Sequence, residues 1–196
     1  GSLVRFHGQD LYEATMSRDF YLSTFEKLKT SPYFDEKKML LTGKEACYVL
    51  DTVDETYLMF SHHYNENIKK VARLEDITDE IFKFTTNFTE ETVEAGEAWV
   101  NEHVPGVKAM TTGFESIDIV LDHVDKGVAI VELAKKLNLD MDQVMAFGDN
   151  LNDLHMMQVV GHPVAPENAR PEILELAETV IGHHKDQSVI AYMEGL

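Results

Sequence analysis

The feature that most constrains the fold is an alternation of helical and strand patterns over the C-terminal third of the chain. Residues 126–139 have one polar face and an otherwise apolar surface, which is typical of a packed helix. Residues 144–147 follow as an uninterrupted apolar run, typical of a strand that is buried on both faces of a parallel sheet. The same alternation continues with a helix at 154–160, a strand at 163–165, a helix at 171–177, a short strand at 180–181 and a helix at 188–194. This order predicts a doubly wound α/β unit.

The rest of the chain is a mixture of shorter patterns. Residues 3–6 and 11–12 predict a hairpin around the turn 7–10, and a helix that Ser17 caps is expected to end before Pro32. The expected elements that follow are strands at 38–41 and 46–50, a helix at 53–67, a strand at 81–85, a helix at 89–103 and two strands within 107–120. Pro105-Gly106 closes a helix and predicts a domain boundary. We therefore expect a hairpin at 1–16, an α/β domain at 17–106 and a second α/β unit at 107–196.

A polar cluster, Gly148-Asp149-Asn150-Leu151-Asn152-Asp153, comes directly after the apolar strand. Ligands of open parallel sheets bind beyond the carboxyl ends of the strands, which is where this cluster is expected. Asp149 and Asp153 are four residues apart, so both carboxylates would lie on one face and suit a hard cation. The adjoining Asn152 amide can donate to a phosphate oxygen. The alternative is a glycine turn followed by an ordinary helix N-cap.

Lys126 stands at the start of the predicted helix, where a positive charge opposes the helix dipole. A nearby anion would explain this position, and a phosphate held by the ammonium and free helix amides is one such anion. A solvated surface lysine is the alternative.

Together, Lys126-Gly127, the helix, the buried strand and the cluster Gly148-Asp149-x-x-Asn152-Asp153 closely resemble the last two motifs of the haloacid dehalogenase superfamily. Residues 161–169 also resemble the strand and Asn-Ala turn of its Cof-type branch, whose members carry a large α/β cap. The resemblance covers the whole chain. It implies a doubly wound parallel core with an inserted α/β cap at 17–106.

The resemblance also implies an activity. In this superfamily an aspartate attacks the substrate phosphorus, and water hydrolyses the resulting aspartyl-phosphate while Mg²⁺ neutralises the crowded anions. By resemblance, Asp149 binds Mg²⁺, Asp153 supports the metal or its waters, and Lys126 holds the phosphate. Asn152 contacts the phosphate or the substrate. The implied substrate is a small phosphorylated metabolite such as a sugar phosphate.

The superfamily's nucleophile motif, Asp-x-Asp-Gly-Thr, does not occur in the 196 residues. Asp140-Met141-Asp142 has similar spacing, but it precedes the apolar strand and is interpreted as a loop. Residues 1–4 resemble a strand that follows the nucleophile in the family, so the chain is expected to lack its N-terminal nucleophile segment and to be inactive as given. Two alternatives stay open: a non-catalytic protein that binds phosphate or metal, and an interaction module in the acidic middle section.

The amino-acid composition limits the classes of partner that this chain is expected to bind. Seventeen Lys and Arg against 35 Asp and Glu give a formal net charge of −18, which disfavours nucleic acid and anionic membranes. A single cysteine, Cys47, and the absence of a long apolar run favour a cytoplasmic protein. A sheet edge left open by a missing strand predicts self-association. Six aromatic residues of the middle section are interpreted as its core: Phe60, Tyr64, Phe82, Phe84, Phe88 and Trp99.

Overall fold

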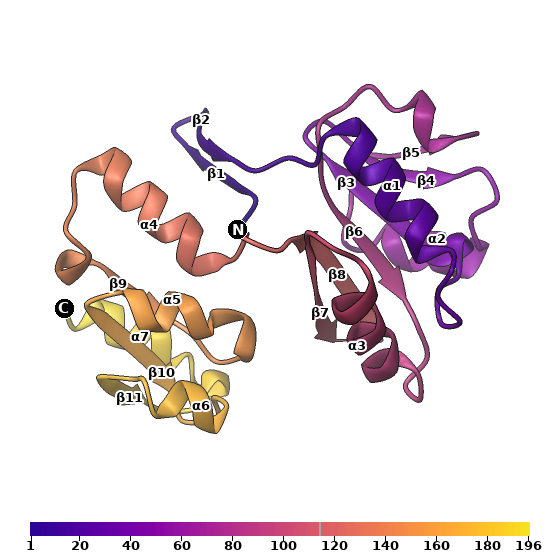
Figure 1. Ribbon diagram of the computed structural model, residues 1–196. Coiled ribbons are helices and arrows are strands. Elements are labelled where there is room, and N and C mark those ends of the chain that lie inside the picture. Colours follow the sequence, from indigo (N-terminus) through magenta and orange to yellow (C-terminus); the bar gives the residue numbers. More distant parts are fainter. Residues whose placement is uncertain (114) are drawn as a thin grey trace. The chain divides into compact units, whose positions relative to one another are not determined.

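The computed structural model describes residues 1–113 and 115–196 and divides into two compact units (Figure 1). Unit 1 comprises Gly1–Glu13 together with Val124–Leu196, and unit 2 is the continuous segment Ala14–His123. The candidate phosphate-handling residues all belong to unit 1. The two units are described separately below.

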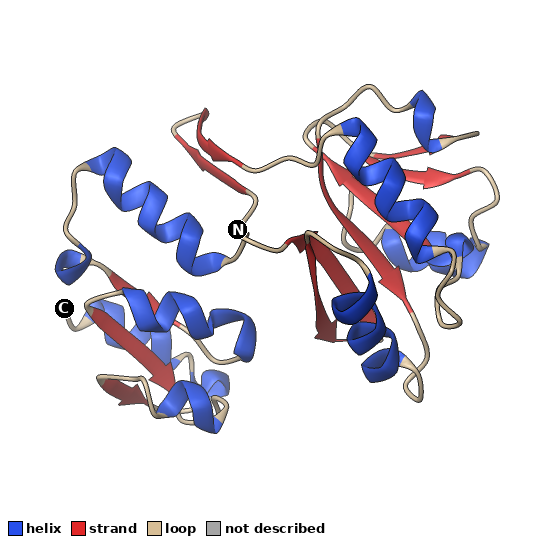
Figure 2. Cartoon of the chain, viewed as in Figure 1, coloured by secondary structure: helices blue, strands red, loops and turns tan. Residues whose placement is uncertain are grey.

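Unit 1 contains a hairpin and a three-stranded parallel sheet in the order β11-β10-β9 (Figure 2). Its elements are β1 (Leu3–Phe6), β2 (Gln9–Glu13), α4 (Lys126–Leu137), β9 (Met145–Phe147), α5 (Leu154–Val159), β10 (His162–Pro166), α6 (Pro171–Leu174), β11 (Thr179–Ile181) and α7 (Ser188–Glu194). Helices α5 and α7 lie on opposite faces of the sheet (Figure 1). This arrangement confirms the predicted doubly wound α/β unit.

The core of unit 1 is small and lies between the sheet and helices α5 and α6. Its buried residues are Met157, Ala165, Ala169 and Ile173. The prediction that residues 144–147 are buried on both faces is only partly correct, because Met145 and Phe147 are half-buried and Ala146 alone of β9 is buried. In the described part of the chain β9 is an edge strand of its sheet and β10 is the central strand, so the apolar side chains of β9 are less enclosed than those of β10.

Unit 2 is built on a six-stranded mixed sheet in the order β5-β4-β3-β6-β8-β7. Its strands are β3 (Met39–Gly43), β4 (Cys47–Leu50), β5 (Ile68–Val71), β6 (Ile81–Asn87), β7 (Val107–Gly113) and β8 (Ser116–Leu121), and its helices are α1 (Arg18–Leu28), α2 (Glu55–Ser61) and α3 (Val93–His103). Helices α1 and α3 pack on one face, where the larger hydrophobic core lies. Helix α2 packs on the other face, over a smaller cluster that includes the buried thiol of Cys47.

The predicted N-cap of α1 is confirmed, whereas helix α2 is shorter than predicted. Ser17 Oγ accepts a hydrogen bond from Phe20 N at 3.3 Å, as expected for the cap of α1. Asp54 caps α2, which ends at Ser61 and not at residue 67. The Asn65 side chain donates to Ser61 O at 3.0 Å, which satisfies a carbonyl at the helix end and lets the chain turn into β5.

The expected boundary at residue 107 differs from the division that the structure shows. The strands β7 and β8, assigned to the second unit by sequence, belong to the sheet of unit 2, where β8 pairs with β6 and β7 pairs with β8. The side chains of Ile117 and Ile119 are fully buried in its core. Pro105-Gly106 therefore forms a turn from α3 into β7, with Gly106 at φ +76°, and the division follows His123.

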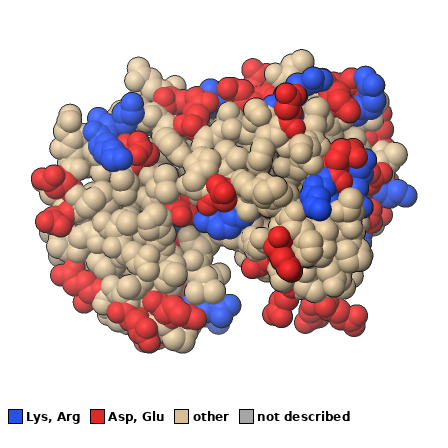
Figure 3. Space-filling model, in the orientation of Figure 1, with Lys and Arg blue, Asp and Glu red and all other residues tan. Residues whose placement is uncertain are grey.

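The acidic side chains are scattered over the visible surface and do not gather in a single patch (Figure 3). None of the helices in the described residues has both the length and the apolar character that a bilayer crossing requires.

Candidate active site

The polar cluster lies where the sequence placed it, in the turn that joins the carboxyl end of β9 to α5. Gly148 opens the turn, and its backbone N–H donates to Val164 O of the neighbouring strand at 3.1 Å. A Cβ atom at this position would lie 2.9 Å from Cβ of Asp153 and 2.9 Å from Sδ of Met157. The turn can therefore fold back on α5 only because residue 148 has no side chain.

The Asp153 carboxylate is buried and holds the turn in place. One oxygen, Oδ2, accepts hydrogen bonds from the backbone N–H of Asp149 at 3.0 Å and of Asn150 at 3.2 Å. The other, Oδ1, accepts a short hydrogen bond from Nζ of Lys126. Asp153 thus joins the turn after β9 to the first residue of α4, a contact between residues that are far apart in sequence.

The sequence predicted an anion near Lys126. Within unit 1, the carboxylate of Asp153 is such an anion. The Lys126 side chain is nevertheless half-exposed. A lysine carries three N–H donors, so two remain for a second anion. The structure thus brings two of the predicted site residues, Lys126 and Asp153, into direct contact.

Burial by itself would raise the pKa of the Asp153 carboxyl. The hydrogen bonds from Lys126, Asp149 N and Asn150 N outweigh it, and the pKa lies below its ordinary value. Asp153 is therefore an anion at neutral pH and can form an ion pair with Lys126.

Asp149 differs from Asp153 in its surroundings. Its side chain is exposed at the carboxyl end of β9, while its backbone carbonyl accepts a hydrogen bond from Arg170 N at 2.9 Å. The side chain of Asn152 is also exposed. The two aspartates do not form the matched pair of carboxylates that their spacing suggested, because Asp153 turns back onto the backbone.

The next question is which carboxylates of this site can bind Mg²⁺. No group of three or more His, Cys, Asp or Glu side chains suited to a metal occurs in the described residues. Mg²⁺ commonly keeps several waters and uses one or two carboxylates together with substrate phosphate oxygens. The exposed carboxylate of Asp149 fits such a site, whereas both oxygens of Asp153 already accept hydrogen bonds.

Sequence reasoning missed a second polar pair beside Lys126. Asp125 caps α4 by accepting from Val128 N at 2.9 Å, and the same oxygen lies 2.7 Å from Nδ1 of His155 on α5. The capping role of Asp125 was readable, since aspartate directly before a helix favours an N-cap. Its contact with His155 depends on how α4 and α5 pack.

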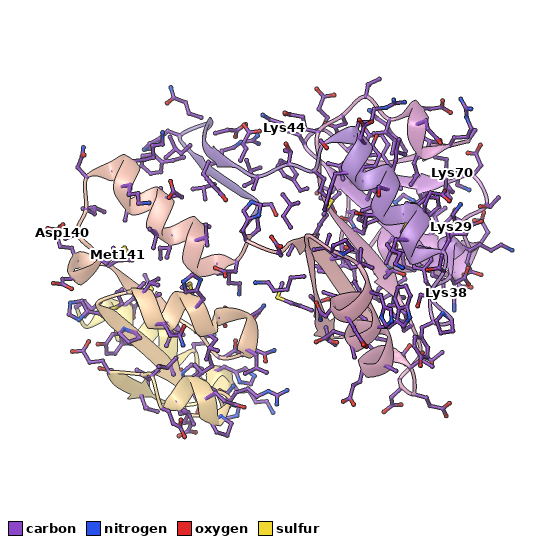
Figure 4. The ribbon with its side chains drawn as sticks, viewed as in Figure 1. Lys29, Lys38, Lys44, Lys70, Asp140 and Met141 are labelled. Carbon is purple, nitrogen blue, oxygen red and sulfur yellow. The ribbon has the colours of Figure 1, made fainter. Side chains whose placement is uncertain are left out.

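The loop interpretation of Asp140-Met141-Asp142 is confirmed. Asp140 and Met141 lie on the turn between α4 and β9, at the end of β9 opposite to Asp149 (Figure 4). The Asp140 backbone N–H bonds to Oε1 of Gln143 at 3.1 Å, which closes a short 3-10 turn.

Similarity to known proteins identifies the family. The model of a family described as haloacid dehalogenase-like hydrolase matches residues 1–193. The chain belongs to the haloacid dehalogenase-like hydrolase family. The structure of this hydrolase is a mixed α/β fold with a parallel core sheet, as the resemblance implied.

Two curated relatives of the hydrolase are named phosphatases. One is the 5-amino-6-(5-phospho-D-ribitylamino)uracil phosphatase YbjI of Escherichia coli, 26% identical over 191 residues, covering 97% of this chain and 69% of the relative. The other is the HMP-PP phosphatase of Serratia proteamaculans, 36% identical over 85 residues, covering 42% of this chain and 31% of the relative.

Among solved structures, SMU.1108c of Streptococcus mutans is similar to the hydrolase with a TM-score of 0.84 and 22% identity. The match covers 100% of this chain and 73% of that protein, and it establishes a shared fold.

Proposed function

We propose that the protein to which this chain belongs is a Mg²⁺-dependent phosphatase acting on small phosphorylated metabolites, with unit 2 as its cap. Family membership and the phosphatase names of the relatives support the reaction. The observation that carries the proposal is the Lys126–Asp153 pair, held beside the exposed carboxylate of Asp149 at the end of β9.

The proposed roles follow from these contacts. Lys126 uses the donors that Asp153 leaves free to hold a phosphate oxygen. Asp153 pairs with the lysine and fixes the turn, so it supports the metal site indirectly. Asn152, exposed on the same turn, donates to the phosphate or the substrate.

Asp149 is proposed to hold Mg²⁺, which would supply positive charge against the phosphate oxygens. No nucleophile is assigned among the 196 residues, because they lack the Asp-x-Asp-Gly-Thr motif. The second candidate function is therefore binding of phosphate and metal without turnover by the chain as given.

The test is phosphate release from an aryl phosphate and a panel of sugar phosphates, with Mg²⁺ and with a chelator. It is run on the 196-residue chain and on the full-length natural protein. Asp149→Asn is expected to lower Mg²⁺-dependent release about a hundredfold, the scale of losing one charge-stabilising group. Asp142→Asn, an exposed aspartate before β9, is the matched control and should keep full activity.

Phosphate release by the full-length protein that does not depend on Mg²⁺ or Asp149 would contradict the proposed function. If neither form releases phosphate, the second candidate is tested by ³¹P NMR titration with inorganic phosphate. Binding should then weaken in Lys126→Met.

A further inference from the structure

Unit 2 contains a cavity of about 440 Å³ that the roles proposed above do not use. It lies on the sheet face opposite α1 and α3, between helix α2 and the ends of β7 and β8. Cavities that hold small organic ligands in proteins are of about this size, roughly 300–1,000 Å³. All its described lining residues belong to unit 2, so it is a site of that unit by itself.

The floor of the cavity is a polar network on two neighbouring strands. Lys83 Nζ of β6 donates to Oδ2 of Asp118 on β8 at 2.5 Å, and Thr85 Oγ1 donates to Oδ1 at 2.7 Å. The side chains of Lys83 and Asp118 are 30% and 18% exposed, so a ligand can reach both. The lysine keeps two further N–H donors and the carboxylate keeps lone pairs.

The charge of this floor selects against anions. Lys83 and Asp118 neutralise each other, and the other described lining residues are uncharged. A phosphate or carboxylate would meet Asp118 without a cation of its own. The network instead offers donors and an acceptor side by side, which suits a neutral ligand that has both.

One wall of the cavity is aromatic. The rings of Phe60 and Tyr64 lie 5.2 Å apart at 57°, and Tyr57 packs beside them with its hydroxyl 3.3 Å from Thr85 O. Tyr64 is 65% exposed, which contradicts its interpretation as a core residue. A large aromatic ring left in solvent at the mouth of a cavity provides a surface on which a planar ligand can stack.

We propose that this cavity binds an uncharged, planar heteroaromatic ring of pyrimidine size that carries both amide N–H and carbonyl groups. The ring stacks on the Phe60–Tyr64 wall, and its polar edge bonds to Lys83 and Asp118. Such a ring is either the organic part of the phosphorylated substrate or a separate ligand. Only the first of these sources rests on the proposed function.

The binding test uses isothermal titration calorimetry of the full chain with uridine. A dissociation constant on the order of 1 mM or tighter is expected for a ligand of this size. Tyr64→Ala should weaken binding about tenfold or more, because a stacked base loses its aromatic partner. Met59→Ala is the matched control, since Met59 lies on α2, five residues before Tyr64, is 69% exposed and does not line the cavity.

The electrostatic test replaces the acceptor. Asp118→Asn keeps the size of the side chain but leaves Lys83 without its counter-charge. Uridine should bind at least severalfold more weakly, while inorganic phosphate should gain affinity for the variant. Circular dichroism of each variant verifies that the fold is kept.

The proposal is overturned if uridine does not bind the wild-type chain, if ribose binds as tightly as uridine, or if Tyr64→Ala does not change the affinity for uridine.

The source of the ring is then found by kinetics on the full-length protein. Competitive inhibition of phosphate release by uridine identifies the ring as part of the substrate, and non-competitive inhibition identifies a separate ligand. Both results support the proposal that the cavity binds the ring. An inactive protein would count against the proposed function alone, because uridine binding and its loss in Tyr64→Ala need no turnover.

Discussion

At the scale of single residues, the Asp153 carboxylate joins two parts of the candidate site. It accepts hydrogen bonds from the backbone of the turn and from Lys126. The spacing of Asp149 and Asp153 predicted that both carboxylates lie on one face and suit a hard cation. The structure separates their surroundings, since one carboxylate is exposed and the other is buried. Residue type and spacing located the site, but burial decided what each carboxylate contacts.

The Lys126–Asp153 pair gives a stability prediction. Lys126→Met removes the charged donor and leaves a buried carboxylate with backbone partners only. The free energy of unfolding at pH 7 is expected to fall by about 1–3 kcal/mol, the cost of an incompletely satisfied buried polar group. Urea unfolding of both proteins measures it, with Lys136→Met on the exposed face of α4 as the matched control.

The same pair predicts the sign of a pH effect. Because the folded pKa of Asp153 is depressed, its contribution to stability is present above the ordinary carboxyl value of 3.8 and is lost as pH falls through the folded pKa. The stability difference between wild type and Lys126→Met should therefore be full at pH 7 and shrink below pH 3.8. A difference that stays constant down to acid unfolding would contradict this account.

At the scale of elements, the site depends on how closely α4 and α5 approach. A Cβ atom at Gly127 would lie 2.5 Å from Cγ of His155 and 2.8 Å from its backbone carbonyl carbon. Lys126 reaches Asp153 across this contact. The Lys-Gly pair of the motif thus combines a functional charge with the close packing that places it.

Gly127→Ala tests this packing. Alanine normally stabilises a helix relative to glycine by about 1 kcal/mol. Here the added methyl overlaps α5, so we expect a net loss of about 1–3 kcal/mol in the free energy of unfolding. Gly195→Ala is the control, because its Cβ would meet only ordinary contacts at 3.5 Å and beyond. A stabilised Gly127→Ala protein would show that α4 and α5 are not in close contact.

Helices and strands were predicted correctly where the local sequence pattern was strong. The predictions failed where contacts with side chains outside the segment determine the bounds of an element. Ser17 predicted the start of α1, and the helix–strand alternation after residue 126 was confirmed element by element. The strand β5 was missed, because its residues pair with β4 only after α2 has ended at Ser61. That ending uses the Asn65 amide, a detail that apolar periodicity does not report.

At the scale of the whole molecule, the chain forms two units of different construction. Unit 2 is continuous in sequence, and its hydrophobic clusters consist entirely of residues between Ala14 and His123. Unit 1 is discontinuous, because the β1–β2 hairpin at the start of the chain contacts helix α4, which lies after unit 2.

A fragment of residues 14–123 is therefore expected to fold by itself, whereas residues 124–196 should be markedly less stable without their hairpin. The chain's single tryptophan, Trp99, packs against the core of unit 2 and reports on that unit alone. Cooperative urea unfolding of the 14–123 fragment, followed by Trp99 fluorescence and circular dichroism, checks this. A non-cooperative transition would show that unit 2 needs the rest of the chain.

The sequence by itself determined the α/β class, the family and the position of the cluster at 148–153, because apolar periodicity and the order of polar motifs are local properties of the chain. Only the tertiary structure decided that β7 and β8 join unit 2 and that Asp153 faces Lys126. It also decided that Tyr64 lies at the mouth of a cavity and not in a core. The physical reason is that burial and pairing depend on which distant segments meet, and local patterns do not encode those contacts.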